Sequence, residues 1–210
     1  MKAVLVKALA LSAALAASTA HAKTVTIAID LSGSNPLLVS AEFAAGAADY
    51  AARRIAQLED GDKVRIKTFG ARGSAANALD QVLEISRRQR APKVAAQVQR
   101  FIASLPQQQA KAQAATNIIA TLEFDSGLDC AGGGEVLLLT DGVESSEYVN
   151  AQRFAAARQK LPKPDVDLKG CRVTFYGLGA GLPAPSAKFI RGEWNAWIAA
   201  AGAEFSSEIK

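Results

Sequence analysis

Hydrophobic and polar residues alternate along the chain in short segments that are typical of strands and helices. Apolar or β-branched runs predict strands at residues 24–30, 63–69, 135–140, 172–177 and 204–209, with a short edge strand at 78–86. Helical spacing predicts helices at residues 41–58, 92–105, 116–124, 151–160 and 186–201. This alternation predicts an α/β fold, a doubly wound and mostly parallel sheet with helices on both faces.

The carboxyl ends of two predicted strands carry clustered oxygen-bearing side chains. In doubly wound sheets, ligands bind at these ends. The first strand runs into Asp30, Ser32 and Ser34, and the strand at 135–140 runs into Asp141. Carboxylate and hydroxyl oxygens are the ligands that hard divalent cations prefer. We therefore expect a metal site here, with Gly33 allowing a sharp bend between the two serines.

The first 22 residues have the pattern of a cleaved export signal. Lys2 and Lys7 form a positive start, an apolar run follows at residues 8–17, and Ala20-His21-Ala22 has the small-x-small pattern of a cleavage site. We expect cleavage after Ala22, one domain over residues 23–210, and a periplasmic or secreted location without stable membrane insertion. The alternative is an uncleaved N-terminal anchor.

Charge and histidine content narrow the function. The formal net charge of the whole chain is +4, and loss of Lys2 and Lys7 lowers it to about +2, which is too weak to indicate nucleic-acid binding. His21 is the only histidine and lies in the expected leader. The mature chain therefore lacks a Ser-His-Asp or Cys-His mechanism and histidine ligands for zinc.

The two oxygen-rich loops together resemble the metal-ion-dependent adhesion site of von Willebrand factor A domains. The resemblance rests on the Asp-x-Ser-x-Ser motif at 30–34, on a threonine about eighty residues later, and on Thr140-Asp141-Gly142 after an apolar strand. It covers essentially the whole mature chain. The third loop departs from the family pattern, because Ala114 stands where the family often has glycine.

The family resemblance implies a role for each site residue. Ser32 and Ser34 would ligate the metal directly, and Asp30 and Asp141 would surround it, often through water. Thr116 is the preferred third-loop ligand, over Thr121. The resemblance implies Mg²⁺, or Mn²⁺ or Ca²⁺, and a protein partner whose Asp or Glu fills the open metal position.

Simpler structural roles exist for these and other residues. The two aspartates could cap turns, the two serines could cap the first helix, and Thr116 could be only an N-cap. Glu144 and Glu147 could border the metal, although a solvated loop is the favoured interpretation. Trp194 and Trp197 are expected to pack against the sheet.

The two cysteines are expected to form a disulfide. An even number of cysteines in an exported protein favours a bridge over free thiols. In this fold type, Cys130 and Cys171 both precede neighbouring strands and so lie at the amino-terminal edge of the sheet, opposite the metal loop. A bridge closing a loop of about 40 residues would contribute roughly 4 kcal/mol. A free buried pair is the alternative.

The leading hypothesis is an exported, non-enzymatic binding module that captures a protein through a metal ion. One alternative is metal-assisted hydrolysis, for example of a phosphoester, although no general base is evident beside the loop. Another is a scaffold in an envelope or secretion complex that keeps the fold without using the metal. The sequence does not identify the partner.

Overall fold

The computed structural model describes residues 22–107, 112–130 and 132–208. Residues 1–21 of the expected leader therefore lie outside the described part of the chain. In chain order, the elements are β1 (Thr24–Asp30), η1 (Pro36–Leu38), α1 (Ala41–Ile55), β2 (Lys63–Phe69), β3 (Asp80–Glu84), α2 (Ala91–Ser104), η2 (Leu105–Gln107), α3 (Ile118–Glu123), β4 (Glu135–Leu139), α4 (Ala151–Ala155), β5 (Arg172–Tyr176), α5 (Ala184–Ala200) and β6 (Glu204–Glu208). No helix among these residues is long and apolar enough to cross a membrane.

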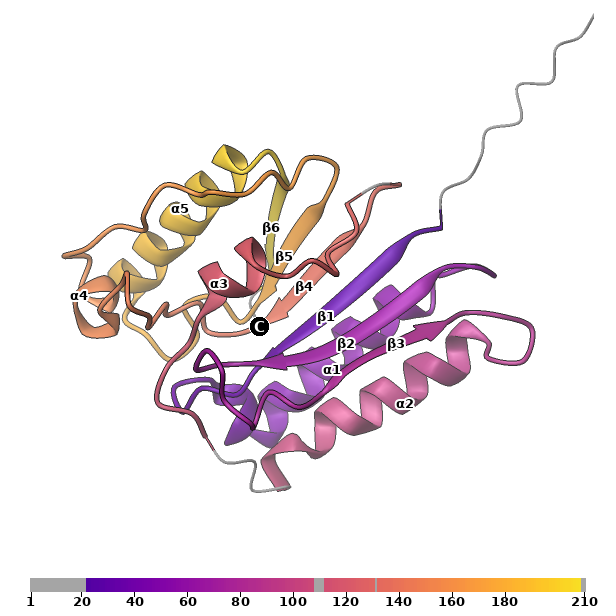
Figure 1. Cartoon of the computed structure of the whole chain (residues 1–210). Helices are drawn as coiled ribbons and strands as arrows, with labels where there is room; N and C mark the ends of the chain where they lie inside the picture. The colour runs from indigo at the N-terminus through magenta and orange to yellow at the C-terminus, as the bar shows by residue number, and fades with distance from the viewer. Residues whose placement is uncertain (1–21, 108–111, 131, 209–210) are drawn as a thin grey trace, which may run out of the picture.

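The six strands form one sheet in the order β3-β2-β1-β4-β5-β6. All neighbours are parallel except the edge strand β3, which is antiparallel to β2. Helices α1 and α2 cover one face, and α3, α4 and α5 cover the other (Figure 1). This confirms the doubly wound α/β fold. The strand order reverses between β1 and β4, so the topological switch point lies at their carboxyl ends.

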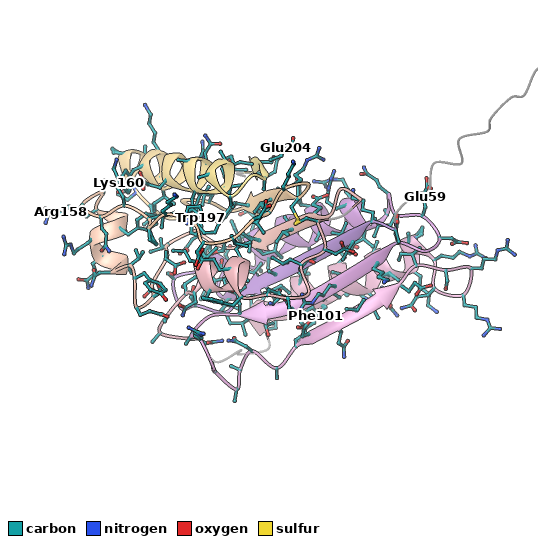
Figure 2. All side chains as sticks on the ribbon, turned by 45° about the horizontal axis from the view of Figure 1, so that its top comes forward. Glu59, Phe101, Arg158, Lys160, Trp197 and Glu204 are labelled. Carbon is teal, nitrogen blue, oxygen red and sulfur yellow. A yellow bond between two sulfur atoms is a disulfide. The ribbon has the colours of Figure 1, made fainter. Side chains whose placement is uncertain are left out.

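The central strands are apolar because both of their faces are covered. All seven residues of β1 and all five of β4 are buried. Along β1, Val25, Ile27 and Ile29 face the α1–α2 layer, whereas Ala28 faces the other layer. Trp194 and Trp197 are buried in that second layer, as expected, and Trp197 lies on the side of α5 that faces the sheet (Figure 2).

Several predicted helix boundaries are wrong by two to five residues. Helix α4 ends at Ala155 rather than at residue 160, because Ala157 takes a left-handed φ of 57° that stops the helix. Helix α1 ends at Ile55 rather than at residue 58. Helix α3 starts at Ile118, since Thr116 pairs with Ser145 in an isolated β-bridge.

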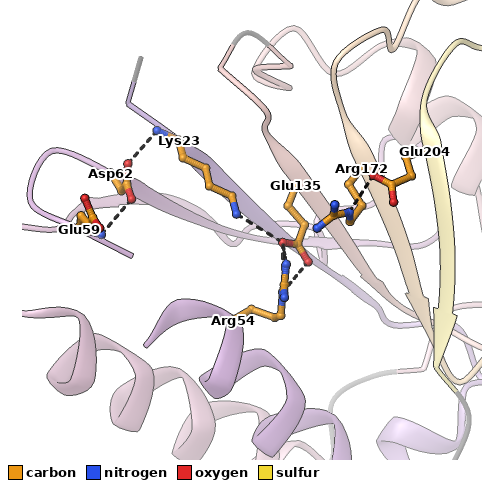
Figure 3. A network of polar contacts seen from close by, with 7 residues as sticks. All are labelled: Lys23, Arg54, Glu59, Asp62, Glu135, Arg172 and Glu204. Atoms are coloured by element: carbon orange, nitrogen blue, oxygen red, sulfur yellow. Dashed lines mark hydrogen bonds and ion pairs between the residues drawn. The ribbon is translucent and has the colours of Figure 1, made fainter. Parts of the chain in front are cut away.

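The amino-terminal edge of the sheet carries a disulfide and a network of ion pairs. Cys130 and Cys171 are joined by a disulfide, with their Cα atoms 4.5 Å apart. Next to it, Glu135 at the start of β4 is 2% exposed and forms a bidentate ion pair with Arg54 of α1 (Figure 3). Lys23 adds a second cation, its Nζ 3.8 Å from Glu135. The buried carboxylate at this edge is therefore paired with two cations.

Candidate functional site

The candidate site lies at the carboxyl edge of the sheet, where β1 and β4 end side by side. Asp30 is the last residue of β1, and Asp141 comes two residues after the end of β4. Because Ile29 pairs with Leu139 in the parallel register, the two carboxylates follow neighbouring positions of adjacent strands. The expectation that these two loops meet at the switch point is confirmed.

Asp30 is buried completely and accepts hydrogen bonds with both carboxylate oxygens. The backbone N–H of Ser32 donates to Oδ1 at 2.7 Å, and the hydroxyl of Thr140 donates to Oδ2 at 2.7 Å. Burial raises the pKa of Asp30 to about 7, although the hydrogen bonds from Thr140 and Ser32 lower it. The carboxylate is thus placed by neutral donors and is costly to ionise there.

The two serines lie close together beside Asp141. Ser32 Oγ is 3.3 Å from Ser34 Oγ, and Ser32 is buried whereas Ser34 is exposed. Asp141 accepts a hydrogen bond from Val143 N at 2.9 Å, and burial raises its pKa while a hydrogen bond from the Ser34 side chain lowers it. Neither serine caps α1, because Ser40 is its N-cap. The capping alternative for the two serines is therefore wrong.

Thr116 lies on the segment that leads into α3 and is 2% exposed. Its backbone N–H donates to Ser145 O at 3.0 Å, and Ser145 N donates to Thr116 O at 2.8 Å. These bonds tie the third segment to the loop that follows Asp141. Asn117, not Thr116, is the N-cap of α3, so the N-cap alternative for Thr116 is wrong. Thr121 lies inside α3 and donates its hydroxyl to Asn117 O.

Gly33 does not have the role expected of it. It is not among the described glycines with positive φ, and a Cβ added there would meet only Ala112 Cβ at 3.6 Å and Gln113 O at 3.7 Å. Such distances are ordinary van der Waals contacts. The left-handed glycine at the site is instead Gly142, with a φ of 76°, where a Cβ would lie 2.1 Å from Leu178 Cδ1.

Two amide side chains that the sequence did not single out hold the site loops in place. Asn35 is fully buried, and its Nδ2 donates to Asp30 O at 2.8 Å and to Leu139 O at 3.0 Å. It thereby joins the ends of β1 and β4. An asparagine just after a metal-like loop is a weak signal, since asparagine is common in turns for other reasons.

Gln113 connects the Asp30–Ser34 loop to the loop after β2. Its backbone bonds both Leu31 and Gly33, while its side chain accepts from Ala71 N at 2.7 Å and donates to Asn77 Oδ1 at 2.7 Å. Gln113 is only 9% exposed, although it follows a polar, glutamine-rich stretch whose residues 108–111 lie outside the described part of the chain. The surrounding glutamines gave no sign that this one is buried.

Glu144 is a third buried carboxyl near the site. It is fully buried, and its Oε2 accepts from Ile118 N at 2.8 Å and from Ile119 N at 3.3 Å. Burial raises the pKa of Glu144 to about 7. The expectation of a solvated loop is therefore wrong for Glu144, whereas Glu147 is partly exposed and contacts Arg72 at 3.5 Å.

The site is rich in acidic side chains that have no cationic partner among the residues that the structure describes. None of the ion pairs formed by described lysines and arginines involves Asp30, Asp141 or Glu144. Over the same residues, no group of three or more His, Cys, Asp or Glu side chains could hold a metal ion. A cation at this edge would therefore depend on hydroxyl ligands as well as on the two aspartates.

A polar pocket of about 420 Å³ opens beside the site, between β2, the loop after it and α3. Its floor carries Arg65 and Lys67, which are paired with Asp80 and Asp125. At its rim, the guanidinium of Arg72 lies 4.9 Å from the ring centroid of Phe124, which is 58% exposed.

Comparisons with known proteins find similarity to this chain among solved structures. No protein-family model and no curated protein sequence matches it. Among solved structures, it is similar to the open conformation of the pilus adhesin SpaC from Lactobacillus rhamnosus GG, with 15% sequence identity and a TM-score of 0.44. That alignment covers 89% of this chain and 28% of the adhesin, so the chain spans well under half of the adhesin's length.

It is also similar to an aerotolerance-related membrane protein from Bacteroides fragilis NCTC 9343, crystallised with multiple mutations to serines. The identity is 17% and the TM-score 0.46, over 90% of this chain and 92% of that one. Similarities this low indicate nothing about function, so what the site does must come from the residues of this chain.

Proposed function

We propose that this chain is an exported, metal-dependent protein-binding module of the von Willebrand factor A type. The observation that carries the proposal is the buried acidic character of the carboxyl edge. Asp30 and Asp141 are at most 2% exposed, the pKa of each is raised, and no described lysine or arginine pairs with either. A buried carboxylate without a cationic partner is expensive, and a bound cation would remove that cost.

The donor set fits Mg²⁺. Ser32 and Ser34 supply hydroxyl oxygens, Asp30 and Asp141 supply carboxylates, and Thr116 is the proposed ligand of the third segment. Mg²⁺ prefers oxygen ligands, takes few protein carboxylates and retains water molecules, whereas thiolates and imidazoles are absent from these loops. When bound, the metal would offer an open coordination position to an Asp or Glu of the partner. Mn²⁺ or Ca²⁺ would compete for the same oxygens.

The neighbouring residues support binding because they hold the loops rigidly. Thr140 orients Asp30, Asn35 joins the ends of the two strands, and Gln113 fixes the backbone on both sides of Ser32. A preorganised site loses less entropy when it binds. The pocket beside the loop, with the exposed guanidinium of Arg72 at its rim, would accommodate residues that flank the partner's acidic side chain.

Binding fits the residues better than hydrolysis does. The mature chain contains no histidine. Glu144, the third buried acid at this edge, has no exposed surface and accepts hydrogen bonds from the start of α3, so it cannot reach a water molecule that attacks a substrate. A hydrolase screen with and without EDTA tests this alternative, and metal-dependent turnover in that screen would replace the binding proposal.

A thermal-denaturation titration tests metal use. With Mg²⁺ or Mn²⁺ at a hundred times its Kd, the protein should gain about 2.7 kcal/mol over the same protein in EDTA. Ser34→Ala should reduce the gain strongly, because the variant lacks one of the proposed metal ligands. Ser34 is exposed, so its replacement should not impair folding. Ser206→Ala on β6 is the matched control and should respond like the wild type. Equal midpoints in Mg²⁺, Mn²⁺ and EDTA would overturn metal binding.

Capture from an envelope fraction tests partner use. The wild-type protein should retain a partner in Mg²⁺ and release it in EDTA, and Ser34→Ala should fail to retain it. Retention of the same partner in EDTA and by the Ser34→Ala variant would instead favour the metal-independent scaffold.

A further inference from the structure

Lys23 is held by carboxylates at both of its nitrogens. Its backbone N lies 2.8 Å from Asp62 Oδ1, and its Nζ lies 3.8 Å from Glu135 Oε2 (Figure 3). Its carbonyl oxygen accepts from Lys63 N at 2.8 Å, which starts the β1–β2 ladder. Lys23 is therefore fixed immediately before β1, at the point where the expected leader joins the folded domain.

The Asp62 carboxylate is fixed by contacts that do not involve the leader. Its Oδ2 accepts from Glu59 N at 2.9 Å, so the side chain spans the turn before β2. The backbone carbonyl of Asp62 accepts from Ile85 N at 2.8 Å, which ties this turn to the end of β3. Oδ1 is thus directed at Lys23 N by the fold itself.

We propose that Asp62 is the receptor for the α-ammonium group of a mature N-terminus at Lys23. In the uncleaved chain, Lys23 N is a neutral amide that donates one hydrogen bond. Removal of the leader would convert the same contact into an ion pair that locks β1 to the turn before β2. This inference depends on cleavage after Ala22 and is independent of the metal site.

The covalent step is the hydrolysis of one peptide bond by a signal-peptidase-type protease. The bond between the Ala22 carbonyl carbon and Lys23 N breaks, the oxygen of water joins Ala22 as a carboxylate, and Lys23 N leaves as an amine. At neutral pH the amine takes up a proton and becomes an ammonium group with three N–H donors. No oxidant or cofactor is needed.

The charges around this group favour the charged form. Asp62 is in hydrogen-bond contact, and Glu59 lies on the same turn. Two cations, the side chain of Lys23 and Arg54, are occupied by Glu135. Lys63 is exposed at the start of β2. The directly contacting carboxylate therefore dominates, and charge-assisted hydrogen bonds of this kind are stronger than neutral ones.

The test starts from the full chain expressed with its leader in an exporting host. Intact mass and N-terminal sequencing should give Lys23 as the first residue. An NMR titration of the purified protein should then give an α-amino pKa about one unit above the ordinary 7.7–8.0. Asp62→Asn should return the pKa to the ordinary range, whereas Asp60→Asn, which removes an exposed charge from the same turn, should leave it raised.

A second measurement separates the ion pair from the turn that Asp62 also stabilises. A chain that retains Ala22 before Lys23 has a neutral amide at this position. Asp62→Asn should lower the midpoint of thermal unfolding more in the chain that starts at Lys23 than in the extended chain. A different mature N-terminus, an unshifted α-amino pKa, or equal losses in the two chains would overturn the proposal.

Discussion

An acidic side chain lies at each end of β4. The two are equally buried, but only one of them has a cationic partner among the described residues. Glu135 before the strand core and Asp141 after it are each 2% exposed. Glu135 is paired with Arg54 and Lys23, whereas the Asp141 carboxylate accepts hydrogen bonds from Val143 N and the Ser34 hydroxyl and pairs with no lysine or arginine among the described residues. Burying a charge is unfavourable unless it is paired. The difference shows that the buried acid at the amino edge has its cations within the fold, and it supports the proposal that the acids at the carboxyl edge take a cation from outside.

Loss of the disulfide is expected to have the largest effect on stability, and it tests whether the two edges of the sheet act independently. Replacing both Cys130 and Cys171 by serine should cost about 4 kcal/mol of unfolding free energy, because the bridge closes a loop of 41 residues. Chemical denaturation measures this loss. If the two edges act independently, Mg²⁺ should stabilise the variant as much as it stabilises the wild type. A smaller Mg²⁺-induced gain in the variant would show that the edges are coupled.

The same acid-to-amide change should lower the unfolding free energy at the amino end of β4 but not at its carboxyl end. In EDTA, Glu135→Gln should cost about 2–3 kcal/mol, below the full value for a buried pair because Arg54 is partly exposed. Asp141→Asn should leave the unfolding free energy unchanged or raise it, since no cation is lost. Denaturant titrations of both variants decide this, with Glu204→Gln as an exposed control within about 0.5 kcal/mol of wild type. A loss for Asp141→Asn equal to that for Glu135→Gln would contradict the contrast.

Glu144 should make the metal-free protein less stable as the pH rises. In the unfolded chain its carboxyl ionises near the ordinary pKa of 4.5, whereas the folded pKa is about 7. Between these values only the unfolded chain releases the proton, so stability falls from about pH 4.5 to pH 7 and then levels. Glu144→Gln retains an acceptor for Ile118 N without the charge, and should gain about 1–2 kcal/mol over wild type at pH 8 in EDTA.

Unfolding free energies of the wild type and the Glu144→Gln variant at pH 5 and pH 8 provide the check. The advantage of the variant should be present at pH 8 and nearly absent at pH 5. An advantage of the same size at both pH values would mean that packing, and not ionisation, causes it.

The smallest expected effect belongs to Gly33. Because the residue lacks a positive φ and a Cβ there meets only ordinary contacts, Gly33→Ala should change stability by less than about 0.5 kcal/mol and preserve the Mg²⁺ response. Gly142→Ala is the informative contrast, since its φ of 76° and the close approach of Leu178 leave no room for a methyl group. Thermal unfolding with and without Mg²⁺ tests both. A large loss of stability in Gly33→Ala would instead support the expectation that Gly33 is needed for a sharp bend.

The strands and the meeting of the two acidic loops could be predicted because their signals are local. The apolar runs at β1 and β4 reflect coverage on both faces, and a parallel sheet then brings Asp30 and Asp141 to the same edge. The pattern also placed β2 at its observed bounds, Lys63–Phe69.

The residues that support the site could not be predicted, because their partners are distant in sequence. Gln113 resembles the polar residues around it, and only the folded chain brings its amide to Ala71 and Asn77. Glu144 looked like a solvated acid because its partners, two N–H groups at the start of α3, lie 25 and 26 residues away. The predicted helix ends were wrong for a related reason. Tertiary contacts and the left-handed backbone at Ala157 determine where the helices end.

The hydrogen bonds that assemble the loop at Asp30–Ser34 also bear on the order of folding. The bond from Thr140 to Asp30 closes a separation of 110 residues, and the bond from Asn35 to Leu139 closes one of 104. Contacts between such distant segments form slowly, because a long loop must lose its entropy before they are made. We therefore expect the site to mature late, after β1 and β4 have docked. Under the proposed function, the chain would become competent to bind a partner only once its sheet is complete.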